Sequence, residues 1–184
     1  MRYIDDSLSG KTVLVTGGAG FIGSNIAFYL QHHHPECKVI VFDSFRSDER
    51  FPSGNFKSLG HFKNLLGFKG EVIAGNINSL EDIKRLYDYE FDYIFHQAAI
   101  SDTTVSDQDL MIRSNVNAFK DILDMALEMN AGVVYASSAG TYGNSPAPNS
   151  VGRGEEPENV YGFSKLMMDN RSEEHTSELQ SPNT

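Results

Sequence analysis

The sequence has a single cysteine, Cys37, among its 184 residues, which excludes an internal disulfide framework and a cysteine-rich zinc site. It has no apolar run near the roughly 18 residues that a membrane-spanning helix needs, and residues 1–6 lack the apolar core of a signal segment. Basic residues are scarce, with 15 Lys and Arg against 25 Asp and Glu and a net charge of −10. Such a balance argues against general nucleic-acid binding, which needs a basic surface. We therefore expect a soluble cytoplasmic protein with no metal site and no membrane or nucleic-acid partner.

The sequence does contain regularly spaced apolar runs. With 40% hydrophobic and 22% charged residues, its composition is that of a globular chain, and its length suits one domain. The runs are continuous rather than alternating, as in strands that are covered on both faces of a parallel sheet. They are Val13–Val15, Val39–Phe42, Val72–Ala74, Tyr93–Phe95 and Val133–Tyr135.

Helical spacing of apolar residues separates these predicted strands. The three helical sets are Ile22, Ile26, Tyr29 and Leu30; Leu80, Ile83 and Tyr87, preceded by the capping residue Ser79; and Phe119, Ile122, Leu123, Ala126 and Leu127. Strand and helix alternate, so right-handed βαβ units should build a doubly wound parallel α/β sheet, the Rossmann fold. Segments 44–55 and 139–159 are predicted loops, and the second is either a functional lid or a plain surface excursion.

A glycine-rich turn joins the first strand to the first helix. The segment Thr16–Gly23 reads TGGAGFIG, which gives G-x-G-x-x-G from Gly18 or G-x-x-G-x-x-G from Gly17. Either spacing permits a tight turn, close approach to a pyrophosphate and close helix packing, and the helix N-terminus attracts anions. Asp43 ends the second strand, where a carboxylate accepts the adenosine ribose hydroxyls and favours NAD. Arg46 could instead neutralise a ribose 2′-phosphate, so NAD and NADP both stay open.

Tyr161 and Lys165 form a Y-x-x-x-K pair that shares one face of the last predicted helix. An ammonium group beside a phenol stabilises the phenolate, the form that acid–base chemistry on a hydroxyl requires. Ser137 and Ser138 follow the fifth strand, at the edge of the sheet where ligands bind. A serine hydroxyl there can bond the reacting oxygen and orient the tyrosine. A bare Y-x-x-x-K pair is common on surfaces, and the order of turn, strand, serine and helix is what favours a catalytic role here.

Other reactive side chains are interpreted as structural or left open. The run His32–His34 lies at a helix end, where cationic side chains suit the helix dipole, and metal binding is the less favoured interpretation. Cys37 and His96 are interpreted as core residues. Asp102, Thr103 and Thr104 could contact a substrate phosphate or cap a helix, and the sequence does not decide between these roles.

Four strings together resemble the extended short-chain dehydrogenase/reductase family, in its NAD-dependent epimerase/dehydratase branch: TGGAGFIG, HQAA, YASSAGTYG and YGFSK. Three longer stretches, Ser58–Leu66, Phe95–Thr104 and Asn159–Asp169, are most similar to epsilonproteobacterial enzymes that epimerise carbon 6 of ADP-heptose. The resemblance covers residues 1–170 and implies an NAD(P)-binding Rossmann domain with a catalytic Ser-Tyr-Lys set. It also implies inversion of carbon 6 through transient oxidation by bound NADP, in lipopolysaccharide precursor synthesis. The implied substrate is ADP-heptose or a related nucleotide sugar, and the implied full-length protein is a homo-oligomer.

The family's site residues fall on matching positions of this sequence. The catalytic residues match Ser138, Tyr161 and Lys165. The predicted cofactor-binding residues, from the turn and from the resemblance, are Tyr161 and Lys165 again together with Gly17, Gly20, Phe21, Ile22, Gly23, Asp43, Ser44, Arg46, Asn76, Ile77, Gln97, Ala98, Ala99, Ser101 and Asn115. Asn76 departs from the family, which has an aspartate at this position near the adenine.

The family continues well beyond this chain, with later strands, most of the substrate domain and a second catalytic base, a lysine. We therefore expect a Rossmann fold that is incomplete at the C-terminus, and no turnover by this chain alone. Residues 171–184 have no helical period, and residues 171–181 can be encoded by a common sequencing adapter, so we predict that 171–184 is a non-native tail. Two alternatives stay open: another nucleotide-sugar 4-epimerase or 4,6-dehydratase, since specificity lies mostly in the absent half, and a cofactor-binding fragment without turnover.

Overall fold

The computed structural model describes residues 8–180, with side chains for residues 8–174. Residues 1–6, which lack a signal core in the sequence, and residues 181–184 of the predicted tail lie outside the described residues. The described chain forms two compact units. The first comprises residues 8–46, 58–98 and 126–135, and the second comprises residues 47–57, 99–125 and 136–180.

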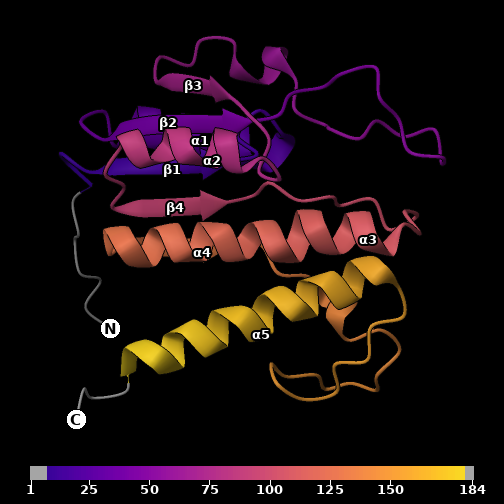
Figure 1. Ribbon diagram of the computed structural model, residues 1–184. Coiled ribbons are helices and arrows are strands. Elements are labelled where there is room, and N and C mark those ends of the chain that lie inside the picture. Colours follow the sequence, from indigo (N-terminus) through magenta and orange to yellow (C-terminus); the bar gives the residue numbers. More distant parts are fainter. Residues whose placement is uncertain (1–7, 181–184) are drawn as a thin grey trace. The chain divides into compact units, whose positions relative to one another are not determined.

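The first unit contains a five-stranded sheet in which every neighbouring pair of strands is parallel (Figure 1). The strands are β1 (Thr12–Thr16), β2 (Lys38–Asp43), β3 (Glu71–Ala74), β4 (Tyr93–His96) and β5 (Gly132–Tyr135), in the order β3-β2-β1-β4-β5. All five predicted strands and the doubly wound α/β class are confirmed. The strand order reverses between β1 and β4, and such switch points are where open parallel sheets bind ligands.

The centre of the sheet is covered on both faces, but its edges are not. Val13 to Val15 in β1 and Val39 to Asp43 in β2 are buried. By contrast, Val72 of β3 is 43% exposed and Val134 of β5 is 50% exposed. The prediction that every apolar run is covered on both faces is therefore wrong for these two strands, because each is an edge strand with one neighbour in the sheet.

Helices of the first unit confirm the predicted elements but not the predicted faces. They are α1 (Phe21–His33), the short helix η1 (Phe62–Leu65), α2 (Leu80–Lys84) and η2 (Arg85–Asp88). In α1 the buried residues include Gly23, Ala27 and Leu30, whereas Ile22 and Tyr29 are each 58% exposed. The apolar spacing predicted that these two side chains point inward. That prediction is wrong, because the face of α1 that carries Gly23 packs against the turn and the sheet.

Several interpretations of single residues in this unit are confirmed. Cys37 is buried in the cluster formed by α1, β1 and β2, and burial raises the pKa of its thiol. His96 is buried at the end of β4, and its Nδ1 lies 2.8 Å from Thr16 Oγ1. The Ser79 hydroxyl accepts a hydrogen bond from the Asp82 amide at 3.2 Å, so it caps α2 as predicted.

The second unit is built mainly of helices. They are α3 (Gln108–Met111), the π-helical segment η3 (Ile112–Asn117), residues 118–125 of α4 (Ala118–Met129), the single turn η4 (Ala139–Thr141) and α5 (Val160–Gln180). Its core contains Phe51, Val105 and Met111, and Val160 and Tyr161 pack against them. Segment 47–57 thus brings Phe51 next to the N-terminus of α5.

Helix α5 begins at a capped residue and extends into the predicted tail. Asn159 Oδ1 accepts a hydrogen bond from the Gly162 amide at 2.8 Å. The helix runs to Gln180, so it continues past residue 170, where the apolar period ends. Arg, Glu and Gln are good helix formers even without an apolar face, which accounts for the continuation. Among residues 8–180, no helix is both long and apolar enough to cross a membrane.

Candidate functional site

The glycine turn after β1 is held by backbone contacts that only glycine allows. Gly17 has φ +66°, a left-handed conformation, and donates its N–H to Phe42 O at 2.8 Å. A Cβ on Gly23 would lie 2.3 Å from Gly17 O, and a Cβ on Gly18 would lie 2.7 Å from a methyl carbon of Val41. These glycines therefore let the turn close and let α1 pack directly on it.

Gly20 differs from the other glycines of the turn. It precedes α1 with φ −75° and ψ 175°, which any residue adopts, and an added Cβ would meet only Gly17 O, at 3.1 Å. Packing therefore constrains Gly20 less than it constrains Gly23, and a glycine here also leaves room for a ligand to approach the turn. In the described structure α1 has neither a side-chain cap nor an acidic residue in its first turn, and Phe21 and Ile22 are exposed. This end of α1 is suited to an anion.

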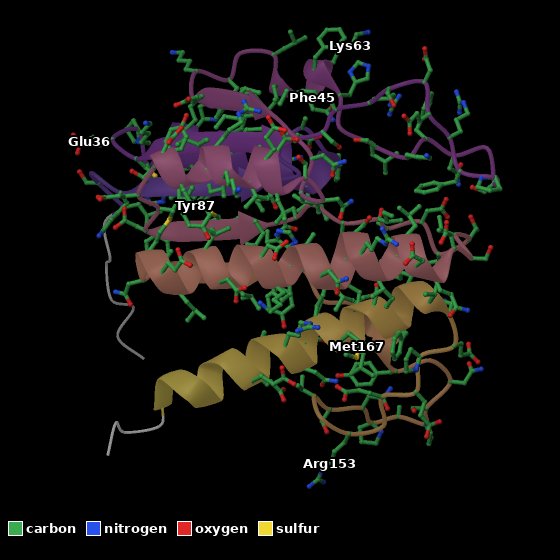
Figure 2. All side chains as sticks on the ribbon, in the orientation of Figure 1. Glu36, Phe45, Lys63, Tyr87, Arg153 and Met167 are labelled. Carbon is green, nitrogen blue, oxygen red and sulfur yellow. The ribbon has the colours of Figure 1, made fainter. Side chains whose placement is uncertain are left out.

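Asp43 lies at the end of β2 and is bonded to the turn. Its Oδ2 accepts a hydrogen bond from the Ala19 amide at 2.9 Å, and its Oδ1 accepts one from the Phe45 amide at 2.7 Å. Burial raises the pKa of the Asp43 carboxyl, and the backbone N–H groups of Phe45, Ala19 and Gly20 oppose that rise. Phe45, labelled in Figure 2, has φ +53°, a conformation that is rare for a residue with a side chain. The carboxylate therefore braces the turn from β2.

Segment 58–64 also packs against this turn, a contact that no pattern in the sequence predicted. Ala19 O accepts hydrogen bonds from the His61 amide at 2.9 Å and from Asn64 Nδ2 at 2.8 Å. A Cβ on Gly60 would lie 2.1 Å from Asp43 Oδ1. Gly60 and Asn64 were therefore missed, although both belong to a stretch that carries the family resemblance.

The remaining predicted cofactor residues of this unit lie in loops that follow β2, β3 and β4. Ser44 and Arg46 are exposed after β2, and the Arg46 amide donates to Gly60 O at 2.7 Å. Asn76 is exposed after β3, and its Oδ1 accepts a hydrogen bond from the Asn78 amide at 2.9 Å, within its own turn. The neighbouring Ile77 is half-buried.

After β4, the chain passes close to the glycine turn. The Gln97 amide donates to Thr16 O at 3.1 Å, and the Ala98 amide donates to Thr16 Oγ1 at 3.3 Å. A Cβ on Gly17 would lie 2.7 Å from the Ala98 nitrogen. The first unit thus brings the predicted residues from Gly17 to Gly23, Asp43, Gln97 and Ala98 together at the carboxyl edge of its sheet.

The other predicted residues belong to the second unit. Asn115 is fully buried in η3, and its Oδ1 accepts a hydrogen bond from the Ile100 amide at 2.8 Å. Its Nδ2 donates to Ile100 O and to Ser164 Oγ, both at 3.0 Å. Asn115 therefore ties the loop that carries Ala99 and Ser101 to helix α5.

Lys165 is buried on α5, and its Nζ donates to Ala136 O at 2.9 Å. The same Nζ lies 6.0 Å from the centre of the Tyr161 ring, so the predicted pair does share one side of the helix. Burial lowers the pKa of Lys165 to about 8, although the Asp169 carboxylate acts in the opposite direction.

Two glycines hold Ser138 and Tyr161 near one another. A Cβ on Gly140 would lie 3.3 Å from Ser138 Oγ and 4.0 Å from Tyr161 Cδ1. A Cβ on Gly162 would lie 2.4 Å from Gly140 O, so η4 and α5 meet at a contact that excludes larger residues. Ser138 Oγ accepts a hydrogen bond from the Gly140 amide at 3.0 Å. The sequence pointed to Ser138 and Tyr161 but not to the glycine pair between them.

The structure shows the hydrogen-bond partners of Asp102. Its Oδ1 accepts hydrogen bonds from the amide and hydroxyl of Thr104, at 2.9 and 2.6 Å, and its Oδ2 accepts one from Asn55 Nδ2 at 2.9 Å. Hydrogen bonds, chiefly those from the Thr104 hydroxyl and from Asn55, lower the pKa of Asp102 to about 2. Asp102 therefore stabilises its own turn and fastens segment 47–57 to it. Among residues 8–174, whose side chains the structure describes, no group of three or more His, Cys, Asp or Glu could hold a metal ion.

These features agree with the comparison to known proteins. The profile of the NAD dependent epimerase/dehydratase family matches residues 13–182. The chain belongs to this family. Among solved structures it is similar to the ADP-L-glycero-D-manno-heptose-6-epimerase of Helicobacter pylori, with 57% sequence identity and a TM-score of 0.86.

Solved structures of lower sequence identity share the fold. The NAD complex of the UDP-glucose 4-epimerase from Brucella ovis is 26% identical, with a TM-score of 0.73 over 91% of this chain and 48% of that one. A UDP-glucose 4-epimerase from Thermotoga maritima is 24% identical, with a TM-score of 0.76 over 91% of this chain and 52% of that one. The H. pylori match covers 95% of this chain and 54% of the H. pylori chain. The chain thus spans about half the length of the structures it matches.

Proposed function

We propose that this chain is the nucleotide-binding and catalytic portion of an epimerase that inverts carbon 6 of ADP-D-glycero-D-manno-heptose, a step toward a lipopolysaccharide precursor. The single observation that carries the proposal is the 57% identity to the H. pylori heptose epimerase over 95% of the chain. The buried Lys165 beside Tyr161 supplies a chemical basis for it.

The residues of the first unit fit a nicotinamide dinucleotide. The uncapped N-terminus of α1 offers backbone N–H groups to a pyrophosphate, and Gly20 leaves room for its approach. Asp43 ends β2 beside the turn, where a carboxylate suits the ribose hydroxyls, and the exposed residue Arg46 follows it, where a cation suits the 2′-phosphate of NADP. When bound, the dinucleotide supplies the reversible hydride acceptor that the family's chemistry needs. We propose NADP as the cofactor, with NAD as the alternative.

The residues of the second unit handle the proton. In its phenolate form, Tyr161 takes a proton from the substrate hydroxyl and becomes a phenol. The Lys165 ammonium, fixed by its hydrogen bond to Ala136 O, stabilises the phenolate that accepts this proton. The Ser138 hydroxyl donates a hydrogen bond to the reacting oxygen and orients it toward Tyr161. These three roles make up an acid–base set for a secondary alcohol.

The decisive experiment supplies the full-length protein with ADP-D-glycero-D-manno-heptose and NADP and follows the two epimers by NMR. The proposal expects conversion to the L-glycero epimer without net reduction of NADP, since the reaction is internally redox-neutral. A matched reaction with UDP-glucose tests the second candidate, a 4-epimerase, which similarity to the Brucella ovis enzyme favours. Turnover of UDP-glucose alone would replace the heptose proposal, and net NADPH formation would indicate a dehydrogenase instead.

A further inference from the structure

Helix α5 carries a third polar group in line with Tyr161 and Lys165. Residues 161, 165 and 169 are spaced four apart, so all three project from one face of the helix. The third is Asp169, which is half-buried. Nothing in the acid–base set described above uses this carboxylate.

Asp169 is anchored to the segment that also holds Lys165. Ser137 Oγ donates a hydrogen bond to Asp169 Oδ2 at 2.6 Å, one residue after the carbonyl that accepts from Lys165 Nζ at 2.9 Å. The segment that follows β5 is therefore bonded to α5 at two successive turns. The next residue along this segment is Ser138, so the same two bonds fix its position along the helix.

Lys165 needs a compensating charge. Its side chain is only 4% exposed, and removing an ammonium group from water favours the neutral amine. The titratable side chains that face it from α5 are those of Tyr161 and Asp169, while the segment after β5 presents the neutral carbonyl of Ala136. The negative charge of Asp169 opposes the effect of burial.

We propose that Asp169, held in place by Ser137, is a positioning residue that keeps Lys165 in its ammonium form beside Tyr161. The proposal deepens the function proposed above and rests on it for the importance of Lys165. The link between Asp169 and Lys165 itself needs no substrate and no turnover. It can therefore be tested in the 184-residue chain, so that its failure is distinct from a failure of the epimerase proposal.

The test is a pH titration of Lys165 followed through its side-chain Cε and Hε signals in ¹³C-lysine-labelled protein. Lys165→Met assigns the signal. The midpoint should lie near 8 in the unaltered chain. Asp169→Asn keeps the shape of the side chain but removes its charge, and should lower the midpoint by about half a unit or more. Asp169→Glu restores the charge and should move the midpoint back toward the original value.

Two further variants make the result decisive. Asp109→Asn removes the same charge from an exposed site that pairs with Arg113, and it should leave the midpoint unchanged. Ser137→Ala keeps the carboxylate but releases it, and should lower the midpoint in the same direction as Asp169→Asn. If Asp169→Asn does not fold, Ser137→Ala serves in its place. A midpoint that moves by less than about 0.2 unit in folded Asp169→Asn or Ser137→Ala, or that moves equally in Asp109→Asn, overturns the proposal.

In the full-length enzyme the same change has a kinetic signature. The ammonium form is present below the pKa of Lys165 and is lost above it. If Asp169→Asn lowers that pKa, the alkaline limb of the kcat profile should move to lower pH, with KM little changed. A uniform loss of kcat at every pH would indicate a structural defect and would contradict the role assigned to Asp169.

Discussion

Alanine at Gly23 would show whether the glycine turn is a packed structure or merely a flexible one. A Cβ at this position would lie 2.3 Å from Gly17 O and 2.8 Å from Gly18 Cα. Both are backbone atoms, so neither can rotate away as the end of a long side chain would. In a helix interior alanine is favoured over glycine by about 1 kcal/mol. Without the contact, the substitution would therefore stabilise α1.

The expected magnitude follows from these opposing effects. Overpacking costs typically about 1–3 kcal/mol, and a contact with fixed backbone belongs at or above the upper end. After the gain in helix propensity is subtracted, we expect Gly23→Ala to lower the free energy of unfolding by about 2 kcal/mol. Gly20→Ala is the matched control, because its Cβ meets only Gly17 O at 3.1 Å and its φ of −75° suits alanine. Its unfolding free energy should fall by less than about 0.5 kcal/mol.

Urea denaturation of the 184-residue chain and its variants measures the free energies, and calorimetric titration with NAD and NADP measures binding. If the dinucleotide binds at this turn as proposed, Gly20→Ala should weaken its binding while leaving stability nearly intact, because the methyl group would stand in the path of the pyrophosphate. A gain in stability for Gly23→Ala would refute the packing explanation. Equal stability losses in the two variants would refute the distinction between the packed glycine and the ligand-facing one.

The remaining predictions concern charged and catalytic groups. Asp43→Asn should shift the ratio of NAD to NADP affinity toward NADP, since it removes a negative charge near the proposed position of the 2′-phosphate. Arg46→Ala should shift the ratio toward NAD. If fluorescence titrations show an unchanged ratio in both variants, the ribose binds elsewhere. In the full-length protein, Tyr161→Phe should reduce the rate of epimer interconversion by about 10²–10⁴-fold. The double variant with Lys165→Met should lose far less activity than the product of the two single losses. Near-normal turnover by Tyr161→Phe would remove Tyr161 from the mechanism. The carboxyl of Asp102 should titrate by NMR with a midpoint near 2, so its stabilising contribution is present at neutral pH and is lost as the pH falls from about 4 toward 2; a midpoint near 4 would contradict its hydrogen-bond network.

The sheet could be predicted because its signal is local. Five short apolar runs gave five strands, and their alternation with helices implied parallel order. The sequence could not tell which strands lie at the edge, because Val72 and Val134 have the same side chain as the buried Val13. Exposure at an edge depends on what covers the strand, and that depends on residues far away in the chain. The buried face of α1 was missed for a related reason, since a glycine that packs on backbone leaves no mark in an apolar period.

The candidate catalytic and cofactor-binding residues could be named from the sequence by type, but their contacts could not. Tyr161 and Lys165 could be named from their spacing, whereas the docking of η4 against α5 through Gly140 and Gly162 could not. A glycine in a loop and a glycine in a helix give no sign in sequence that they meet. Likewise, Gly60 packs against Asp43 across a separation that no local pattern spans.

Asn115 shows most clearly what the sequence leaves undecided. A buried side-chain amide can donate two hydrogen bonds and accept two, so an asparagine beside a catalytic group can serve either a ligand or the fold. Here Oδ1 accepts from the Ile100 amide, and Nδ2 has partners in Ile100 O and Ser164 Oγ. Both donor positions of the amide are therefore occupied, and the residue is fully buried. The residue lies in a π-helical segment, a feature frequent at functional sites. Through these hydrogen bonds Asn115 holds α5 and the loop at residue 100 in register, while its role in cofactor binding stays a prediction.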